Sequence, residues 1–283
     1  MLYKKSTEPA LSGELFRNPT SEYRGTPFWA WNSKLEKDEL CRQIDVFKEM
    51  GLGGFHMHVR TGLENEYLSD EYMDLIRCCT EKAKKENMLA WLYDEDRWPS
   101  GAAGGIVTKN HAFRQRRIIF SPDYDRTVSR RKECEGSFEE DDLKLLTCYD
   151  IVLDEEGYLV SYKRVGKGDA AEGKKWYLFL YVETDSSWYN DEAYLDTLNP
   201  EAVKEFVKVT HERYKECVGD EFDKTVPAIF TDEPQVSRKR TLTRSFDCEG
   251  EVSMPFTDAM PALYKEKYNA DIFDYLPEIV WQL

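Results

Sequence analysis

Basic residues are scarce relative to acids in this chain of 283 residues. The sequence contains 39 Lys and Arg against 54 Asp and Glu, which gives a formal net charge of −15. Nucleic-acid-binding proteins present clustered Lys and Arg to the phosphate backbone, so this charge argues against nucleic acid as a partner. Anionic membrane surfaces are disfavoured for the same reason. We therefore predict that neither nucleic acid nor a membrane is a partner.

Long hydrophobic runs and paired cysteines are also missing. No apolar stretch approaches transmembrane length, and no apolar core follows the basic residues of segment 1–13, so no secretory signal is predicted. The seven cysteines are an odd number without C-x-x-C spacing, at Cys41, Cys78, Cys79, Cys134, Cys148, Cys217 and Cys248. This usage indicates reduced thiols rather than a disulfide framework or a zinc site, and we expect a cytoplasmic protein.

Strands and helices alternate in the first third of the chain. Runs at 27–32, 53–60 and 89–95 are typical of strands, and apolar residues at helical spacing predict helices over 35–51 and 69–88. Strands joined through helices pair in parallel. The G-x-G-x-x-G fingerprint of dinucleotide-binding sheets is absent. We therefore predict an α/β fold of the (β/α) TIM-barrel type rather than an open doubly wound sheet.

The later sequence interrupts this pattern and then resumes it. Alternating strands separated by polar turns predict an antiparallel β insertion, after which a helix at 199–219 and a strand at 226–234 follow. About four barrel strands are expected, so the barrel is apparently partial. The expected organisation is a polar leader at 1–24, a first barrel segment at 25–110, the β insertion at 111–185 and the continuation of the barrel at 186–283.

Polar residues collect where each predicted barrel strand ends. Active sites of β/α barrels are built at the carboxyl ends of the strands, so we expect these side chains to meet at one rim. The predicted substrate-binding residues are Trp31, Asn32, His56, His58, Arg60, Asp94, Glu95, Trp98 and Asp232, and the predicted catalytic residue is Glu233.

The second strand carries His56, His58 and Arg60 on one face, because side chains alternate along a strand. Buried polar side chains need partners, which leaves three interpretations: a structural hydrogen-bond network, a ligand pocket or a metal site. The His-x-His pattern resembles the metal-binding strand of amidohydrolases. The other two histidines, His111 and His211, do not fall on later barrel strands, so no metal ligand set is assigned.

Carboxylates and aromatic rings are interleaved at the end of the third strand. The acids Asp94 to Asp96 would suit a solvated turn, but Trp91, Tyr93 and Trp98 flank them. Carboxylates accept hydrogen bonds from sugar hydroxyls, and aromatic faces pack on the apolar face of a sugar ring. The pattern favours a carbohydrate ligand. The same reasoning applies to Trp29, Trp31 and Asn32 at the end of the first strand.

Glu233 precedes Pro234, which favours extended geometry for the residue before it. We therefore expect Glu233 at the very end of the fourth strand. A carboxyl at an apolar barrel mouth would retain its proton, as a general acid requires. A turn carboxylate is the alternative interpretation.

Four blocks, at 27–63, 67–105, 194–214 and 229–234, together resemble the N-terminal part of the catalytic barrel of glycoside hydrolase family 106, the α-L-rhamnosidase family. The resemblance implies a (β/α)8 barrel, hydrolysis of a terminal glycosidic bond with inversion, and calcium as a cofactor that can be bound. By position, it also implies the acid role of Glu233.

The chain is much shorter than members of that family, which have β-sandwich domains around a complete barrel. Glycoside hydrolysis needs two carboxyls, and the second is not evident here, although Asp94 or Glu95 could substitute geometrically. We expect a homodimer or a missing C-terminal barrel half to cover the open barrel edge.

The leading hypothesis is a glycoside hydrolase-type domain, as an incomplete fragment, that acts on terminal deoxyhexose bonds of the α-L-rhamnoside kind. Its expected partner is a carbohydrate substrate. One alternative is a non-catalytic carbohydrate-binding module. Another is an amidohydrolase-like metal-dependent hydrolase that uses His56 and His58.

Overall fold

The computed structural model describes residues 10, 12–134, 138–156, 158–236, 238–240 and 250–281. The chain divides into two compact units. Unit 1 comprises Met1–Ile106 and Lys204–Pro234, and unit 2 comprises Val107–Val203 and Gln235–Leu283. Unit 2 therefore contains the whole segment predicted to be an insertion, at 111–185, together with residues after 234. No helix among the described residues is long and apolar enough to cross a membrane.

Unit 1 is built on a parallel sheet of four strands in the order β1-β2-β3-β8. The strands are β1 (Phe28–Trp31), β2 (Gly54–Val59), β3 (Leu89–Tyr93) and the short β8 (Ile229–Phe230). All three pairings are parallel, which confirms the prediction from the alternation of strands and helices. The α/β class is confirmed, but the described strands form a sheet with β1 and β8 at its edges rather than a closed barrel.

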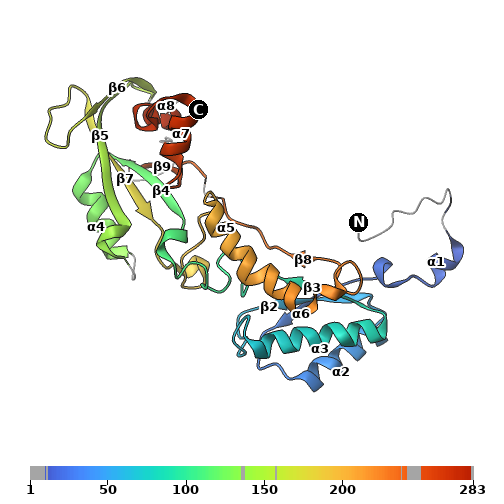
Figure 1. Cartoon of the computed structure of the whole chain (residues 1–283). Coiled ribbons are helices and arrows are strands. Elements are labelled where there is room, and N and C mark those ends of the chain that lie inside the picture. The colour runs from blue at the N-terminus through green and yellow to red at the C-terminus, as the bar shows by residue number, and fades with distance from the viewer. Residues whose placement is uncertain are drawn as a thin grey trace. The chain divides into compact units, whose positions relative to one another are not determined.

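Helices α2 (Lys37–Glu49) and α3 (Asp70–Glu86) lie side by side against this sheet (Figure 1). The Ser69 hydroxyl accepts a hydrogen bond from the Tyr72 backbone N–H and begins α3, and Asn87 ends it in left-handed geometry. The predicted helix at 199–219 is α5 (Pro200–Val207), a π turn (Lys208–Glu212) and α6 (Arg213–Val218). The shorter helices are α1 (Gly13–Arg17), η1 (Ser21–Tyr23) and η6 (Gly219–Glu221).

The two faces of the unit 1 sheet differ in composition. Register pairs Trp29 with Met57 and Trp31 with Val59, and these side chains are buried in the core beneath α2 and α3. The same register pairs Phe28 with His56. The face that carries the histidines, called the aromatic face below, is formed by Phe28, His56, His58, Trp91, Tyr93 and Phe230.

Unit 2 contains an antiparallel sheet of five strands in the order β6-β5-β7-β4-β9. The strands are β4 (Arg116–Ser121), β5 (Leu143–Leu153), β6 (Leu159–Val165), β7 (Lys174–Val182) and β9 (Val252–Phe256). The predicted antiparallel β segment is confirmed. Strand β9 was not predicted, because Pro255 interrupts its pattern. It occupies a sheet edge, where a residue without an N–H is tolerated.

Helices cover both faces of the unit 2 sheet (Figure 1). Tyr124 and Val128 of α4 (Tyr124–Cys134) pack on Ile119 and Phe179. On the other face, α8 (Leu276–Trp281) packs on Phe120 and its neighbours, and α7 (Met260–Tyr268) lies beside it. The remaining short helices are η2 (His111–Phe113), η3 (Glu140–Asp142), η4 (Ser187–Tyr189) and η7 (Ile272–Asp274).

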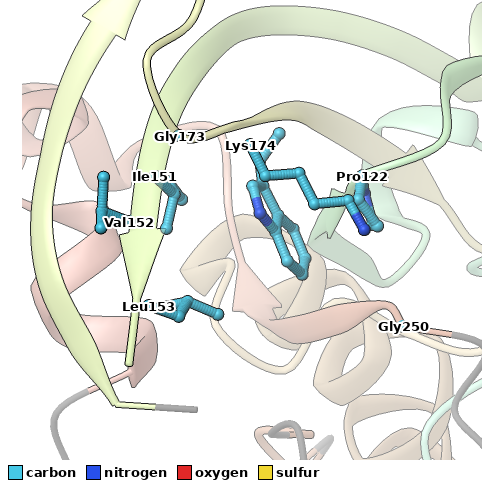
Figure 2. Close-up of a pocket in the computed structure, with 8 residues that line it drawn as sticks. Pro122, Ile151, Val152, Leu153, Gly173, Lys174 and Gly250 are labelled. Carbon is cyan, nitrogen blue, oxygen red and sulfur yellow. The ribbon is translucent and has the colours of Figure 1, made fainter. Parts of the chain in front are cut away.

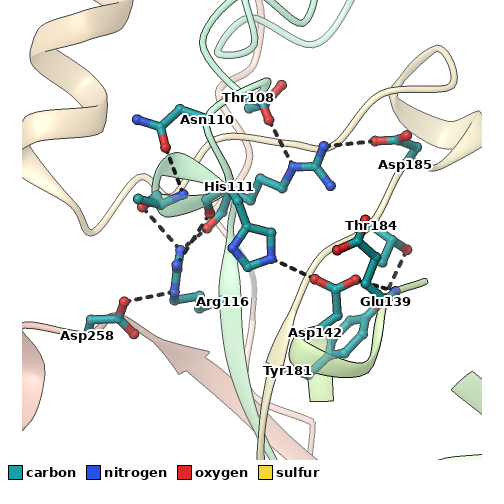
Figure 3. Close-up of polar contacts among 12 residues, drawn as sticks. Thr108, Asn110, His111, Arg116, Glu139, Asp142, Tyr181, Thr184, Asp185 and Asp258 are labelled. Atoms are coloured by element: carbon teal, nitrogen blue, oxygen red, sulfur yellow. Dashed lines mark hydrogen bonds and ion pairs between the residues drawn. The ribbon is translucent and has the colours of Figure 1, made fainter. Parts of the chain in front are cut away.

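Polar contacts fix the chain where it enters this sheet (Figure 3). The buried Arg116 guanidinium donates to the carbonyls of Ala112 and Arg114 and lies 3.1 Å from the Asp258 carboxylate. His111 Nε2 lies 2.7 Å from the buried Asp142 carboxylate. His111 therefore belongs to a local structural network in unit 2.

Candidate functional site

The two histidines of β2 lie on the aromatic face of unit 1, each stacked on a residue of β3. The His58 ring stacks on Tyr93 with ring centroids 4.0 Å apart and an interplanar angle of 10°. The His56 ring stacks on Trp91 at 4.9 Å. The Nδ1 atoms of both histidines and the Tyr93 hydroxyl are buried without a hydrogen-bond partner among the described residues.

Asp232 is the carboxyl nearest to His58, with 3.9 Å between Asp232 Oδ2 and His58 Nε2. Burial, and then the positive charge of Arg60, lowers the pKa of His58 to about 4, so the imidazole is neutral at neutral pH. The contact is therefore not an ion pair. Burial raises the pKa of Asp232, and the negative charge of Glu233 raises it further. Both effects act against the charged form of Asp232.

Stability is expected to fall in acid because of His58. The pKa of a histidine in the unfolded chain is about 6.5, whereas the pKa of His58 in the folded protein is about 4. Between these two pH values the unfolded chain binds a proton at His58 and the folded protein does not. From pH 7 to pH 5 this costs about 2 kcal/mol of unfolding free energy. The variant His58→Phe keeps an aromatic ring on Tyr93 but has no imidazole to protonate. In urea titrations at pH 7 and pH 5, the wild type should lose about 2 kcal/mol more unfolding free energy between the two pH values than the variant does. An unchanged difference between the two pH values would refute the buried neutral imidazole.

Glu233 follows at the same rim and is exposed to solvent. Trp98 Nε1–H donates to Glu233 Oε2 at 3.1 Å. The expectation of extended geometry was wrong, because Glu233 has φ of 44° and β8 ends at Phe230. Two hydrogen bonds tie Asp232 to Ser100, from the Ser100 N–H to the Asp232 carbonyl and from the Asp232 N–H to Ser100 Oγ. These contacts fix the chain just before Glu233 and accompany its strained backbone.

Asp94 is fully buried and links three segments of unit 1. Asp94 Oδ1 accepts from the Ser100 hydroxyl at 2.7 Å, and Oδ2 accepts from the Thr231 hydroxyl at 2.6 Å. His211 Nε2 lies 3.0 Å from the same Oδ2 atom. His211 belongs to the π turn between α5 and α6, an irregularity that is frequent at functional sites. Asp94 therefore holds together the three segments that carry Ser100, Thr231 and His211.

Glu95 is buried to 2% exposure inside the loop that follows β3. Its Oε1 accepts from the backbone N–H groups of Asp96 and Gly104, and its Oε2 accepts from those of Gly101 and Ala103. Burial raises the pKa of Glu95 to about 7, although the four N–H groups act in the opposite direction. Glu95 thus organises residues 95–104.

The remaining predicted rim residues are placed differently. Arg60 and Asn32 are exposed where β2 and β1 end. Trp31 is fully buried on the face covered by the helices, where its ring packs on Trp29 and Tyr72. The structure therefore brings together His58, Asp232, Glu233 and Trp98, with Asp94 and Glu95 beneath them, and does not bring Trp31 to this group.

Three further residues contribute to the site without having been predicted to do so: Ser100, His211 and Thr231. Tyr93, which the sequence marked as an aromatic residue beside the acids, stacks on His58. Tyr93 follows from the alternation that selected His58, since both face the same side of adjacent strands. No local signal identifies His211, because its partner Asp94 lies 117 positions away in the sequence.

The donor side chains of unit 1 and unit 2 decide whether the protein could hold a metal ion. Calcium needs six to eight oxygen ligands, and a catalytic zinc needs three protein ligands. Among the residues that the structure describes, no group of three or more His, Cys, Asp or Glu side chains could hold an ion. The described side chains therefore do not fit a calcium site built on carboxylates or the amidohydrolase-like arrangement.

A cavity of about 450 Å³ lies in unit 2, at one end of the antiparallel sheet (Figure 2). Ile151, Val152 and Leu153 of β5 line one side, and Lys174 lies across from them. Among the described residues that line it, none carries a carboxyl or an imidazole, and Lys174 is the one ionisable side chain.

Comparisons with known proteins bear on the fold. Neither a protein-family model nor a curated protein matches the chain. Among solved structures, the chain is similar to a rhamnosidase from Novosphingobium sp. PP1Y, with a TM-score of 0.52 and 12% sequence identity over 95% of this chain. The shared property is the fold. The match covers 42% of the rhamnosidase, so this chain spans less than half of that protein. The structural similarity to that rhamnosidase therefore extends over most of this chain.

Proposed function

We propose that the rim of unit 1 is the sugar-binding part of a glycosidase-type active site for terminal deoxyhexosides of the α-L-rhamnoside kind. The observation that carries the proposal is the meeting of Asp232 with the neutral His58 at the end of β8, beside the Trp98–Glu233 pair. The fold likeness to a rhamnosidase supports the same class of substrate. Trp98 offers an indole beside a carboxyl, which suits a sugar ring with its hydroxyls.

Glu233 is the proposed catalytic acid, because it is accessible to a ligand and follows Asp232 in the loop after Phe230, where β8 ends. It would give a proton to the glycosidic oxygen as that bond breaks. Asp232 is the second candidate for this role, because burial raises its pKa. In either case, Asp232, His58 and Arg60 would bind the sugar hydroxyls, and His58 would do so as a neutral imidazole that can donate and accept.

Neither Asp94 nor Glu95, the two carboxyls that follow β3, is proposed to activate the water molecule. Inverting hydrolysis needs a second carboxylate that is open to a water molecule. Asp94 and Glu95 are buried, and both oxygens of each already accept hydrogen bonds within the protein. We propose that this carboxylate comes from further barrel strands that cover the aromatic face, supplied by a C-terminal barrel half or a second copy. Phe28 on that face is 58% exposed, which leaves apolar surface for such contacts.

Binding and hydrolysis test the proposal separately. L-Rhamnose is expected to bind saturably, as followed by tryptophan fluorescence, and Trp98→Ala should weaken binding about tenfold through loss of ring contact. Trp188→Ala in unit 2 is the matched control and should leave the affinity unchanged. Absence of rhamnose binding by the wild type would refute the proposed site.

Hydrolysis of 4-nitrophenyl α-L-rhamnoside separates the two candidate acids and the alternative function. Glu233→Gln should abolish turnover and leave rhamnose binding intact, whereas Asp232→Asn should weaken both. The reverse pattern would assign the acid role to Asp232. Because the second carboxylate is proposed to come from a second copy or a C-terminal barrel half, turnover is expected only where that part is present. Binding without turnover in its presence would support the alternative of a non-catalytic carbohydrate-binding module.

A further inference from the structure

Two cysteines face each other across the contact between α2 and α3. Cys41 Sγ in α2 lies 3.7 Å from Cys78 Sγ in α3, although the two residues are 37 positions apart in the sequence. Both side chains are half-buried, so small reagents can reach them from solvent. The helices that carry them pack directly on each other.

The other described cysteines differ from this pair. Cys79 and Cys148 are buried, and Cys217 donates its thiol hydrogen to the Met73 carbonyl at 3.2 Å. Cys79 neighbours Cys78 in α3, but its side chain is buried in the core of unit 1. Among the described residues, Cys41 and Cys78 are therefore the two thiols that combine mutual proximity with access to solvent.

We propose that Cys41 and Cys78 form an oxidation site that closes into an intramolecular disulfide linking α2 to α3. A disulfide bond is about 2.05 Å long, so the sulfurs must approach each other by side-chain rotation and a small movement of the helices. The inference is independent of the proposed sugar site, since neither cysteine belongs to the rim.

Oxidised glutathione is a suitable co-reactant, and the chemistry balances in two steps. The Cys41 thiolate attacks one sulfur of oxidised glutathione, which breaks that disulfide and releases one glutathione thiolate. The Cys78 thiolate then attacks Cys41 Sγ and releases the second. The protein loses two protons and two electrons, and oxidised glutathione gains them as two thiols.

The surroundings favour this order of attack. Burial, together with the neighbouring Cys41 thiol, raises the pKa of Cys78 to about 11. Cys78 is therefore a poor first nucleophile, since the thiolate is the reactive form. Once Cys41 carries glutathione, its sulfur is already adjacent to Cys78, and the second step is intramolecular.

The cross-link should stabilise the pair of helices that covers the unit 1 sheet. It closes a loop between residues 41 and 78, which restricts the unfolded chain. The midpoint of thermal unfolding of the oxidised protein is expected to rise by about 5 °C, and dithiothreitol should reverse the rise.

The test is treatment of the native full chain with oxidised glutathione, followed by peptide mapping without reduction. A peptide pair joined through Cys41 and Cys78, about 2 Da lighter than the two free peptides, is expected. Cys41→Ser should lose both the pair and the thermal shift, and the control Cys217→Ser should keep both. A stable glutathione adduct on Cys41, a link from Cys78 to Cys79, or an equal thermal shift in Cys41→Ser would overturn the proposal.

Discussion

Glu95→Gln is expected to lower the free energy of unfolding by about 4 kcal/mol, the largest effect predicted for this protein. Each Glu95 oxygen accepts two backbone N–H groups from the loop that follows β3. Whichever way a glutamine amide is oriented, its NH₂ group replaces one of these acceptors. Two buried N–H groups then lose their partner and face another donor.

Urea titration at about pH 8, above the raised pKa of Glu95, measures this effect. Glu64→Gln makes the same chemical change at an exposed position and should change the free energy by less than about 0.5 kcal/mol. Rhamnose binding should also weaken in Glu95→Gln, because Trp98 belongs to the loop that Glu95 organises. A loss as small as that of the control would show that water replaces the missing acceptor.

Asp94→Ala is expected to cost about 3 kcal/mol of unfolding free energy. The substitution leaves the buried Ser100 hydroxyl, the Thr231 hydroxyl and the His211 imidazole without the carboxylate that they share. The control Asp38→Ala, in the exposed first turn of α2, should lose less than about 1 kcal/mol.

A double-mutant cycle with His211→Ala tests whether the contact with Asp94 accounts for the effect of the histidine. If Asp94 is its principal partner, His211→Ala should destabilise the wild type more than it destabilises Asp94→Ala, with a coupling of about 1 kcal/mol. Strictly additive losses would mean that His211 contributes independently of Asp94.

Predictions from local patterns succeeded where one segment contained the whole signal. The strands β1, β2 and β3 and the helices α2 and α3 follow from apolar spacing, capping residues and turn residues. Parallel pairing followed from the order of these elements alone, because a helix between two strands brings the chain back to the same end of the sheet.

Predictions failed or stayed incomplete where the outcome depended on distant segments. The pattern of β9 is broken by Pro255, and its place at a sheet edge depends on β4, more than 130 residues earlier. Trp31 carries the same aromatic signal as Trp98, yet it packs in the core because its register partner is Val59. The geometry of Glu233 followed its contact with Trp98 and the contacts of the preceding Asp232 with Ser100, rather than the preference imposed by the following proline.

The sequence by itself determined that acids, histidines and aromatic rings stand at the carboxyl ends of parallel strands. The alternation of side chains along a strand, and the order of strands and helices along the chain, can both be read from the sequence. Only the tertiary structure decided which of those carboxyls remain available. Asp94 and Glu95 are occupied by hydrogen bonds inside unit 1, whereas Asp232 and Glu233 lie at its rim. The physical reason is that a carboxylate's availability depends on its burial and on donors from other segments, and neither is a property of the residue's own neighbourhood in the sequence.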